Sequence, residues 1–455
     1  MNRTRGMFFL LLLGWIFLLD PAAAQPQLLP IPPLTSKDRI LVLAPHEDDE
    51  TLGAGGLIQQ AVETGAAVRV VYLTYGDHNE LAFLLYRKRP WLTPKIREQM
   101  GELRRTESLE AMAYLGVPGK DLIFLGYPDG GTLEVWKKHW GRMPPFKSRA
   151  TRKTFVLYED AFSYRRPHKG EEVVKDLEQQ LLEFRPTRIF VTQPVDGQPD
   201  HRAYYLFLQV ALRDIAGQIP PAEVFTYPIH IGTWPYPRGA RPDEPMSIPK
   251  QLTDEESPWR SLELTPEEAR RKAAAIRVYK TQTVDSLSWM EGFARRNELF
   301  NAVPEIPLRL EEWSSTQGVT ARSETEAYEQ ESPETHLAGV AYRNAGTGLQ
   351  VRIGLRRPLE QELGVSLYAF GYRRNQPFGA MPKLRISWRM ERLRVWDRGF
   401  AIFKSGIQVE SAPKEVLVTI PWLLLGEPDT VFVQVQGQVS RLPISQTSWR
   451  VLRRE

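Results

Sequence analysis

One short segment of the sequence concentrates side chains that perform acid–base or metal chemistry. In the run Ala44-Pro45-His46-Glu47-Asp48-Asp49-Glu50, one imidazole lies among four carboxylates. Carboxylates this close repel one another unless they share a cation or a proton. Paired acids after a strand also serve as helix caps, because a helix N-terminus favours negative charge. Taken alone, the segment leaves both a metal site and a capping role open.

A second segment, Asp196-Gly197-Gln198-Pro199-Asp200-His201-Arg202, carries another imidazole much further along the chain. Two histidines and one carboxylate, with one coordination position left open, are the ligand set of a hydrolytic zinc site. On its own, His201 would be read as an ordinary surface histidine. A fold that brings His201 beside His46 and Asp49 makes Zn²⁺ the expected cofactor.

Both segments follow predicted strands, so a parallel sheet would bring them to the same edge. Arg39–Ala44 and Arg188–Thr192 are short, apolar and rich in β-branched residues, as strands covered on both faces are. Further strands are predicted at residues 68–74, 122–125 and 223–227, with helix-period segments between them. This alternation predicts an α/β fold with a mainly parallel, Rossmann-like sheet and helices on both faces. In such sheets, ligands bind at the carboxyl ends of the strands.

The second half of the chain has a different hydrophobic period. Residues 311–334 are rich in Ser, Thr, Glu and Gln and are predicted to be a polar linker. Residues 335–455 contain several short segments in which apolar and polar residues alternate, which predicts a β-sandwich. We therefore expect an α/β domain at 25–310 and a sandwich domain, possible site of carbohydrate binding, at 335–455.

The N-terminus is predicted to be a secretory signal peptide spanning residues 1–24. Arg3 and Arg5 precede an apolar run at 7–19, and Ala22-Ala23-Ala24 supplies small residues for cleavage. The run is shorter than the roughly 20 residues that cross a bilayer. An exported protein, periplasmic or extracellular and without a stable membrane anchor after cleavage, is expected. The absence of cysteine excludes disulfide bonds.

The charge balance argues against a nucleic-acid partner. The formal net charge is only +4, from 59 basic and 55 acidic side chains that are mixed along the chain. Nucleic-acid-binding domains carry a basic patch or stripe that this composition does not indicate.

Several motifs together resemble one known family. The run APHEDDE, followed later by PDHRA, is similar to the PIG-L/LmbE-like family of zinc N-acetylglucosamine deacetylases, whose signatures are usually AHPDDE-like and HPDH. Further matching pieces are Thr74-Tyr75-Gly76-Asp77, Arg104-Arg105-Thr106-Glu107, Gly126-Tyr127-Pro128-Asp129-Gly130 and Tyr279-Lys280-Thr281-Gln282. The resemblance covers residues 38–300.

The resemblance implies a role for each matching residue. It implies that His46, Asp49 and His201 are zinc ligands and that Asp48 is the catalytic base. It also implies that Arg104 contacts substrate hydroxyls, with Asp129 as a further candidate in the same pocket. The alternative for Arg104 is a solvated helix residue paired with Glu107 at i, i+3.

The mechanism expected for this set is metal-assisted amide hydrolysis. Zinc polarises the acetyl carbonyl and lowers the pKa of water, while Asp48 accepts the proton of the attacking water. Asp48 and Asp49 are adjacent in a turn, so one can ligate while the other faces the open position. The amine must then leave protonated.

Gln198 departs from the family pattern at the proton donor. It stands where the family has the first histidine of HPDH, and an amide cannot deliver a proton near neutral pH. Three possibilities stay open: Asp48 carries the proton to the amine, another histidine such as His230 or His78 supplies it, or turnover is slow or absent. Gln198 also remains a candidate hydrogen-bond donor to the oxyanion.

Aromatic residues near His230 and in the sandwich are compatible with sugar contacts but do not require them. Trp234, Tyr236 and Trp259 form either a sugar-stacking wall or ordinary packing. The sandwich segments around Trp422 and Trp449 resemble carbohydrate-binding modules at the level of the fold only.

Two classes of function therefore compete. The first is an exported, zinc-dependent deacetylase acting on an N-acetylated amino sugar or glycan. The second is a carbohydrate-binding protein that keeps the metal pocket but has lost turnover through Gln198. A less favoured third is an amidase for another N-acyl compound.

Overall fold

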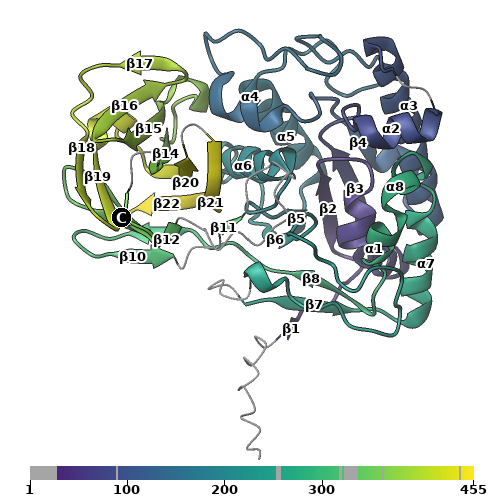
Figure 1. The fold of residues 1–455 in the computed structure, drawn as a ribbon. Helices are drawn as coiled ribbons and strands as arrows, with labels where there is room; N and C mark the ends of the chain where they lie inside the picture. The colour runs from purple at the N-terminus through teal and green to yellow at the C-terminus, as the bar shows by residue number, and fades with distance from the viewer. Residues whose placement is uncertain are drawn as a thin grey trace, which may run out of the picture.

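The computed structural model describes residues 28–88, 91–252, 258–316, 320–321, 337–359, 363–439 and 442–455. An α/β half, which also carries a small second sheet, lies beside a half made almost wholly of strands (Figure 1). The predicted signal peptide lies outside the described residues, and so does most of the predicted linker. Within the described part of the chain, none of the helices has both the length and the apolarity needed to cross a bilayer.

A five-stranded parallel sheet forms the centre of the first half, as the alternating pattern predicts. Its order is β4-β3-β2-β5-β6, and every neighbouring pair runs parallel. The bounds are β2 Arg39–Ala44, β3 Ala67–Tyr72, β4 Leu122–Phe124, β5 Arg188–Thr192 and β6 Glu223–Tyr227. The three central strands are almost wholly buried, which is why they appear in the sequence as continuous apolar runs.

Helices cover both faces of this sheet. One group packs around α1, and the other packs around α6 on the side of the sandwich (Figure 1). The first group is α1 Asp49–Glu63, α2 Glu80–Arg87, α3 Pro94–Leu115, α7 Pro266–Ile276 and α8 Lys280–Glu291. The second group is α4 Thr132–Lys138, α5 Gly170–Phe184 and α6 Pro199–Asp214. Sequence periodicity anticipates α1, α3 and α5.

The strand order contains one reversal of direction. From the central β2 the chain moves outward through β3 and β4, and then returns to place β5 on the other side of β2 and β6 beyond it. The carboxyl ends of β2 and β5 thus flank a topological switch point, where a crevice opens in folds of this type. The two chemistry-bearing segments leave the sheet at these two ends.

The second half is a β-sandwich, which confirms the predicted fold class. One sheet has the order β10-β12-β13-β19-β18, and the other runs β11-β21-β20-β14-β15-β16-β17, with β22 paired to β20 and β9 to β22. The first sheet comprises β10 Ser314–Thr316, β12 Leu337–Asn344, β13 Gly348–Leu355, β18 Gln408–Ala412 and β19 Glu415–Pro421. The second comprises β9 Ile306–Leu308, β11 Thr320–Ala321, β14 Leu363–Tyr372, β15 Lys383–Arg389, β16 Arg392–Asp397, β17 Phe400–Ile402, β20 Thr430–Val439, β21 Leu442–Thr447 and β22 Arg450–Arg454. Alternating apolar side chains from the two sheets form one buried core.

The chain passes from the first half into the sandwich just after a small sheet. A small sheet of β1 Leu29–Pro30, β7 Arg260–Glu263 and β8 Asn297–Phe300 lies beneath the α/β half. Just after β8, β9 pairs in parallel with the C-terminal strand β22. The predicted boundary at 310 therefore falls a few residues after the chain has joined a sandwich sheet.

An aromatic cluster fills the junction between the halves. Trp136 of α4 lies between rings of its own half and rings of the sandwich, at centroid distances of 5.2 Å to Phe378, 5.4 Å to Phe432 and 6.0 Å to Trp449. Trp449 is fully buried, so it packs in this junction and is not an exposed sugar platform. Trp422 is likewise buried, in the core of the sandwich.

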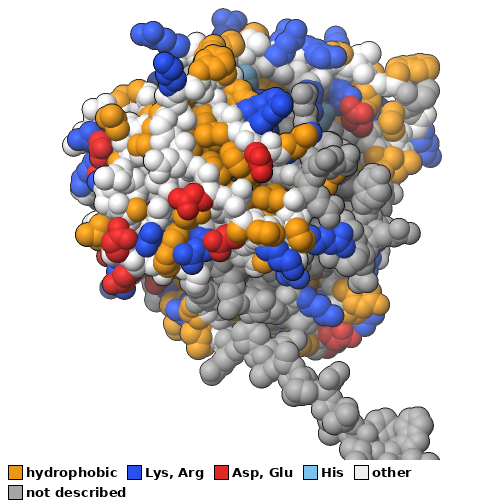
Figure 2. Space-filling view, turned by 60° about the vertical axis from the view of Figure 1, so that its left-hand side comes forward, with side chains coloured by type: hydrophobic (Ala, Val, Ile, Leu, Met, Phe, Trp, Pro, Cys, Tyr) orange, Lys and Arg blue, Asp and Glu red, His pale blue; other side chains and the backbone are white. Residues whose placement is uncertain are grey.

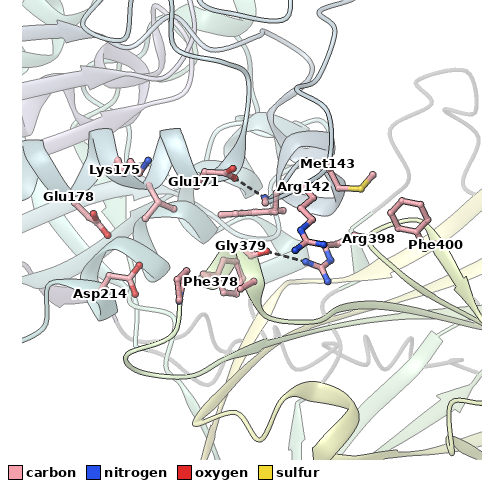
Figure 3. A pocket seen from close by; sticks show the side chains of 15 residues that line it. Arg142, Met143, Glu171, Lys175, Glu178, Asp214, Phe378, Gly379, Arg398 and Phe400 are labelled. Atoms are coloured by element: carbon pink, nitrogen blue, oxygen red, sulfur yellow. Dashed lines mark hydrogen bonds between the residues drawn. The ribbon is translucent and has the colours of Figure 1, made fainter.

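A cavity of about 690 Å³ lies next to this cluster, between α5 and the loops of the sandwich (Figure 3). Glu178 and Asp214 line one side, and Arg142, Arg398 and Phe400 line the other. This cavity does not contain any of the predicted site residues. On the face shown in Figure 2, basic and acidic side chains are interspersed with hydrophobic ones, in keeping with the mixed charge of the sequence.

Replacing Trp136 by alanine tests whether the two halves stabilise each other. We expect Trp136→Ala to lower the free energy of unfolding by about 3–5 kcal/mol, because it leaves a cavity lined by rings from both halves. Chemical denaturation measures the change. The control is Phe403→Ala, at a side chain that is 95% exposed, which should change stability little. A small effect of Trp136→Ala would mean that the junction contributes little.

Candidate metal centre and active site

Three predicted ligands meet at the switch point. His46 follows β2, Asp49 begins α1, and His201 lies in the first turn of α6 after β5. The Oδ2 atom of Asp49 is 3.3 Å from Nδ1 of His46 and 3.1 Å from Nε2 of His201, and the two nitrogens are 3.2 Å apart. Ligand atoms about 2.0–2.1 Å from a tetrahedral zinc ion lie about 3.3 Å from one another. The three donor atoms therefore have the spacing and the chemistry of a zinc site.

The other nitrogen of each histidine faces a carboxylate. Nε2 of His46 is 3.2 Å from Oδ1 of Asp129 and 3.3 Å from Oδ2 of Asp200. Nδ1 of His201 is 3.2 Å from Oδ2 of Asp196. Carboxylates in these places hold the proton of each imidazole on the side away from the ligand position and fix the orientation of the ring.

Asp196 and Asp200 also organise the loops around the site. Asp196 accepts hydrogen bonds from the backbone N–H groups of Gln198, Ile229 and His230. Asp200 accepts from the N–H of Gly130 and from the N–H and hydroxyl of Thr132, and so anchors the loop that carries Asp129. Neither residue was expected from the sequence to have a role in the site. The only sequence feature that could have indicated their roles is that they lie in the same short segment as His201.

Charge at the centre is balanced by protons when no metal is bound. Burial alone would lower the pKa of both histidines. The carboxylates of Asp196 and Asp49 nevertheless raise the pKa of His201 to about 9, and those of Asp129, Asp200 and Asp49 raise the pKa of His46 well above its ordinary value. A divalent ion would replace these protons.

Asp48 lies at the centre in a conformation unusual for its residue type. Its φ of 132° and ψ of −30° fall outside the regions that non-glycine residues normally occupy. Burial and the neighbouring carboxylate of Asp49 raise the pKa of Asp48 well above its ordinary value. A half-buried carboxyl group with a raised pKa beside the ligands suits the predicted role of a base.

Arg104 of α3 is buried and points toward the site, not toward solvent. Its Nη1 donates to the carbonyl of Gly76 at 2.6 Å, and Glu107 accepts hydrogen bonds from Thr281. The alternative of a solvated Arg104 is therefore wrong. Gly76 has φ +56°, and a Cβ atom there would lie 2.2 Å from Nη1 of Arg104 and 2.4 Å from Oε2 of Glu47, so this position requires glycine.

Glu47 occupies the position at which the resemblance has proline. The residue is fully buried, and neither carboxylate oxygen has a hydrogen-bond partner. Burial raises the pKa of Glu47 well above its ordinary value, although Arg104 nearby opposes this. The burial of Glu47 was not predicted, because nothing in the sequence distinguishes it from the three acidic residues that follow it.

The remaining predicted residues divide between the site and its surroundings. His230 lies beside His201, with ring centroids 5.1 Å apart, and stacks on Trp289 at 5.0 Å. Burial lowers the pKa of His230 to about 4, so its ring is neutral near pH 7. Gln198 is exposed and precedes the first turn of α6. Of the aromatic residues predicted either to stack on sugar or to pack, Trp259 is buried, whereas Tyr236 is 78% exposed.

Fold and site together define an α/β domain with a three-ligand metal site at its switch point. The family model described as PIG-L, GlcNAc-PI de-N-acetylase, matches residues 41–212. These residues therefore form a PIG-L family domain, as the sequence motifs predict.

Curated relatives agree with this assignment. A 1D-myo-inositol 2-acetamido-2-deoxy-alpha-D-glucopyranoside deacetylase of Mycobacterium sp. (strain KMS) is 37% identical over 189 residues, which cover 40% of this chain and 52% of that protein. A protein of the same name from Geodermatophilus obscurus is 27% identical over 281 residues, covering 55% of this chain and 85% of that protein. The chain thus spans about half the length of the first of these relatives.

Solved structures that match part of the chain include two deacetylases. The N,N'-diacetylchitobiose deacetylase of Pyrococcus horikoshii has 19% sequence identity and a TM-score of 0.34, covering 55% of this chain and 72% of its own. The A40926 pseudoaglycone deacetylase Dbv21 has 20% identity and a TM-score of 0.37, covering 58% of this chain and 96% of its own.

Replacing Asp196 tests whether the carboxylates behind the ligands matter. We expect Asp196→Asn to weaken zinc binding by about 10–100-fold, because His201 loses the charge that fixes its proton and ring. Competition with a chromogenic chelator measures the affinity. Asp160→Asn, at an exposed carboxylate, is the matched control and should leave the affinity unchanged. Equal affinities for the two variants would contradict this assignment.

The protonated state of the metal-free histidines predicts the pH dependence of zinc binding. Because their pKa values are raised, to about 9 for His201, zinc binding near neutral pH must release protons. We therefore expect the affinity to rise about tenfold per pH unit for each proton released between pH 6 and 8. Calorimetry in buffers of different ionisation enthalpy counts these protons. A pH-independent affinity would show that the ligands are already deprotonated.

Proposed function

We propose that this chain is a zinc-dependent hydrolase that removes the acetyl group from an N-acetylated amino sugar or glycan. One observation carries the proposal: Nδ1 of His46, Oδ2 of Asp49 and Nε2 of His201 converge within 3.1–3.3 Å of one another at the switch point. The PIG-L domain and the deacetylase names of the relatives support the reaction class.

The donor set fits zinc and leaves room for chemistry. Two imidazoles and one carboxylate are three protein ligands, which is the usual number in a catalytic zinc site that keeps one position open. Bound zinc would polarise the acetyl carbonyl and lower the pKa of water. Magnesium and calcium prefer oxygen ligands, so two nitrogen donors argue against them.

Asp48 is proposed to move the proton. It adjoins the ligand Asp49 and has a backbone conformation that is unusual for a residue with a side chain. It would accept a proton from the attacking water. A nearby cation would lower its raised pKa and keep it ionised at neutral pH. Arg104, from α3, and Asp129, from the loop after β4, would bind sugar hydroxyls.

The leaving amine still requires a proton. Gln198 cannot supply one, because an amide is not an acid near neutral pH. His230 has a pKa of about 4, so its imidazole is almost entirely deprotonated near pH 7 in the metal-free structure. This favours Asp48 as the group that carries the proton from water to the amine. Such a shuttle needs no second acid, at some cost in rate.

Export remains part of the proposal. The basic residues, apolar run and small residues of positions 1–24 support a cleaved signal peptide. The protein would then act in the periplasm or outside the cell.

Replacing Asp48 tests the enzyme against the alternative of a metal-retaining carbohydrate-binding protein. We expect Asp48→Asn to keep zinc and to reduce acetate release from N-acetylglucosamine and its oligomers by about 10²–10⁴-fold, because the base is lost. Acetate is measured with a coupled assay, and zinc by elemental analysis of the same samples. Wild-type protein that binds zinc and sugar without releasing acetate would favour the binding protein.

Replacing Gln198 by histidine tests whether an acid is missing. Gln198 lies three residues before His201 at the start of the same helix and is exposed. We expect Gln198→His to raise kcat about tenfold or more, because it adds a proton donor of suitable pKa. An unchanged kcat would mean that the proton already has an efficient carrier, and a lower kcat would give the amide its own role.

A further inference from the structure

The large hydrophobic side chains exposed on the protein gather in one region. Among residues whose exposure the structure describes, six of the fifteen lie on or just after α2 and on α8. They are Leu81 at 62%, Leu85 at 45%, Tyr86 at 38%, Trp91 at 64%, Val284 at 42% and Leu287 at 37%. We call these six residues the apolar lip. The two helices pack against each other (Figure 1), which places these residues on neighbouring elements.

The pattern along α2 shows that this exposure is not incidental. The helix buries Ala82 and Phe83 against the protein and leaves Leu81 and Leu85, one turn apart, directed outward. A helix that served only to cover the sheet would present polar residues on that outer side. Two leucines and a tryptophan facing water cost stability and solubility unless another surface covers them.

Exposed lysines lie close to the residues of the lip along the chain. Lys88 is exposed at the end of α2, Lys95 at the start of α3 and Lys280 at the start of α8. The nearby acid Glu80 is paired with Arg97, so its charge is offset. An apolar strip of leucine and tryptophan with a basic rim is the composition of surfaces that lie in the interface of an anionic membrane.

The helices of the lip also carry or adjoin residues of the metal centre. His78, two residues before α2, donates its backbone N–H to Asp129 at 2.7 Å, and Asp129 faces His46. Trp289 on α8 stacks on His230, which lies beside His201. A surface that covered the lip would therefore lie next to the loops around the site.

We propose that the apolar lip docks the protein reversibly on an anionic phospholipid bilayer, with the loops around the metal centre next to the lipid surface. Leu81, Leu85 and Trp91 would enter the boundary between headgroups and acyl chains, and Lys88, Lys95 and Lys280 would meet lipid phosphates. The exposed lysines beside these apolar side chains favour an anionic bilayer, because they supply positive charge for lipid phosphates where the apolar side chains would enter the lipid. This inference does not depend on the proposed function.

The absence of cysteine permits a local test. In the full chain, Leu81→Cys or Trp91→Cys introduces a single thiol that can carry a polarity-sensitive fluorophore. The probe is a vesicle of equal parts phosphatidylcholine and phosphatidylglycerol. We expect a blue shift and shielding from an aqueous quencher at both positions. The control Phe403→Cys, on the sandwich, should show neither, and this control also reports any binding through the N-terminal apolar run.

Charge dependence is tested in the same labelled protein. Vesicles of phosphatidylcholine alone should give a weaker signal, and Lys88→Glu with Lys95→Glu should weaken binding by at least about fivefold for each side chain changed. Added salt should act in the same direction. These substitutions lie on exposed positions outside the metal centre, so acetate release from soluble N-acetylglucosamine should stay as in the wild type.

Three results would overturn the proposal. One is the absence of a shift at positions 81 and 91, and another is an equal shift at 403. The third is a concentration-dependent dimer, seen by sedimentation without lipid and abolished by Leu81→Ser, which would assign the lip to a second copy of the chain. Docking without acetate release would support this inference and contradict the proposed function. Acetate release without docking would support the proposed function and contradict this inference.

Discussion

The structure depends on the balance of charge at the carboxyl ends of β2 and β5. Seven ionisable side chains, His46, Glu47, Asp48, Asp49, Asp129, Asp196 and His201, are held in a space with little access to water. Buried carboxylates so close together are tolerated only where positive charge lies among them. Protons on two imidazoles supply that charge in the metal-free protein, and the spacing of the donor atoms allows one divalent ion to supply it instead.

The rest of the α/β half holds these groups in place. Each loop that follows a parallel strand contributes one part: β2 gives His46 and the strained Asp48, β4 gives Asp129, and β5 gives Asp196 and His201. The loop after β3 brings Gly76 close enough to receive a hydrogen bond from Arg104. Tyr279, from the start of α8, hydrogen-bonds to Thr51 and Glu50 in the first turn of α1, and so fixes the helix that begins at Asp49.

Sequence reasoning predicts those features that a local pattern determines. Continuous apolar runs gave β2 and β5 at their observed bounds, and alternation gave most sandwich strands, because burial on one or two faces leaves a periodic record in the chain. The convergence of His46, Asp49 and His201 was inferred from motifs at strand ends. The ligand roles themselves remain predictions until metal is measured.

Features that arise from distant contacts were not predictable. The roles of Asp196 and Asp200 depend on which loop lies behind each histidine. The burial of Trp449 and Trp422 depends on which face of the sandwich meets α4 and which becomes its core. Aromatic residues at such positions have the same composition whether they bind sugars or pack, so the sequence could not separate the two uses.

The strand order has a consequence for how the protein assembles. β2 and β5 are neighbours in space but are separated along the chain by two other strands and five helices, so the ligand set forms only after a long loop has closed. Contacts between such distant segments slow folding, because the entropy of closure is lost before the contacts form. Early, partly folded states would then lack the three-ligand pocket. Ion capture would thus be a late event in maturation and would mark chains whose central sheet is already complete.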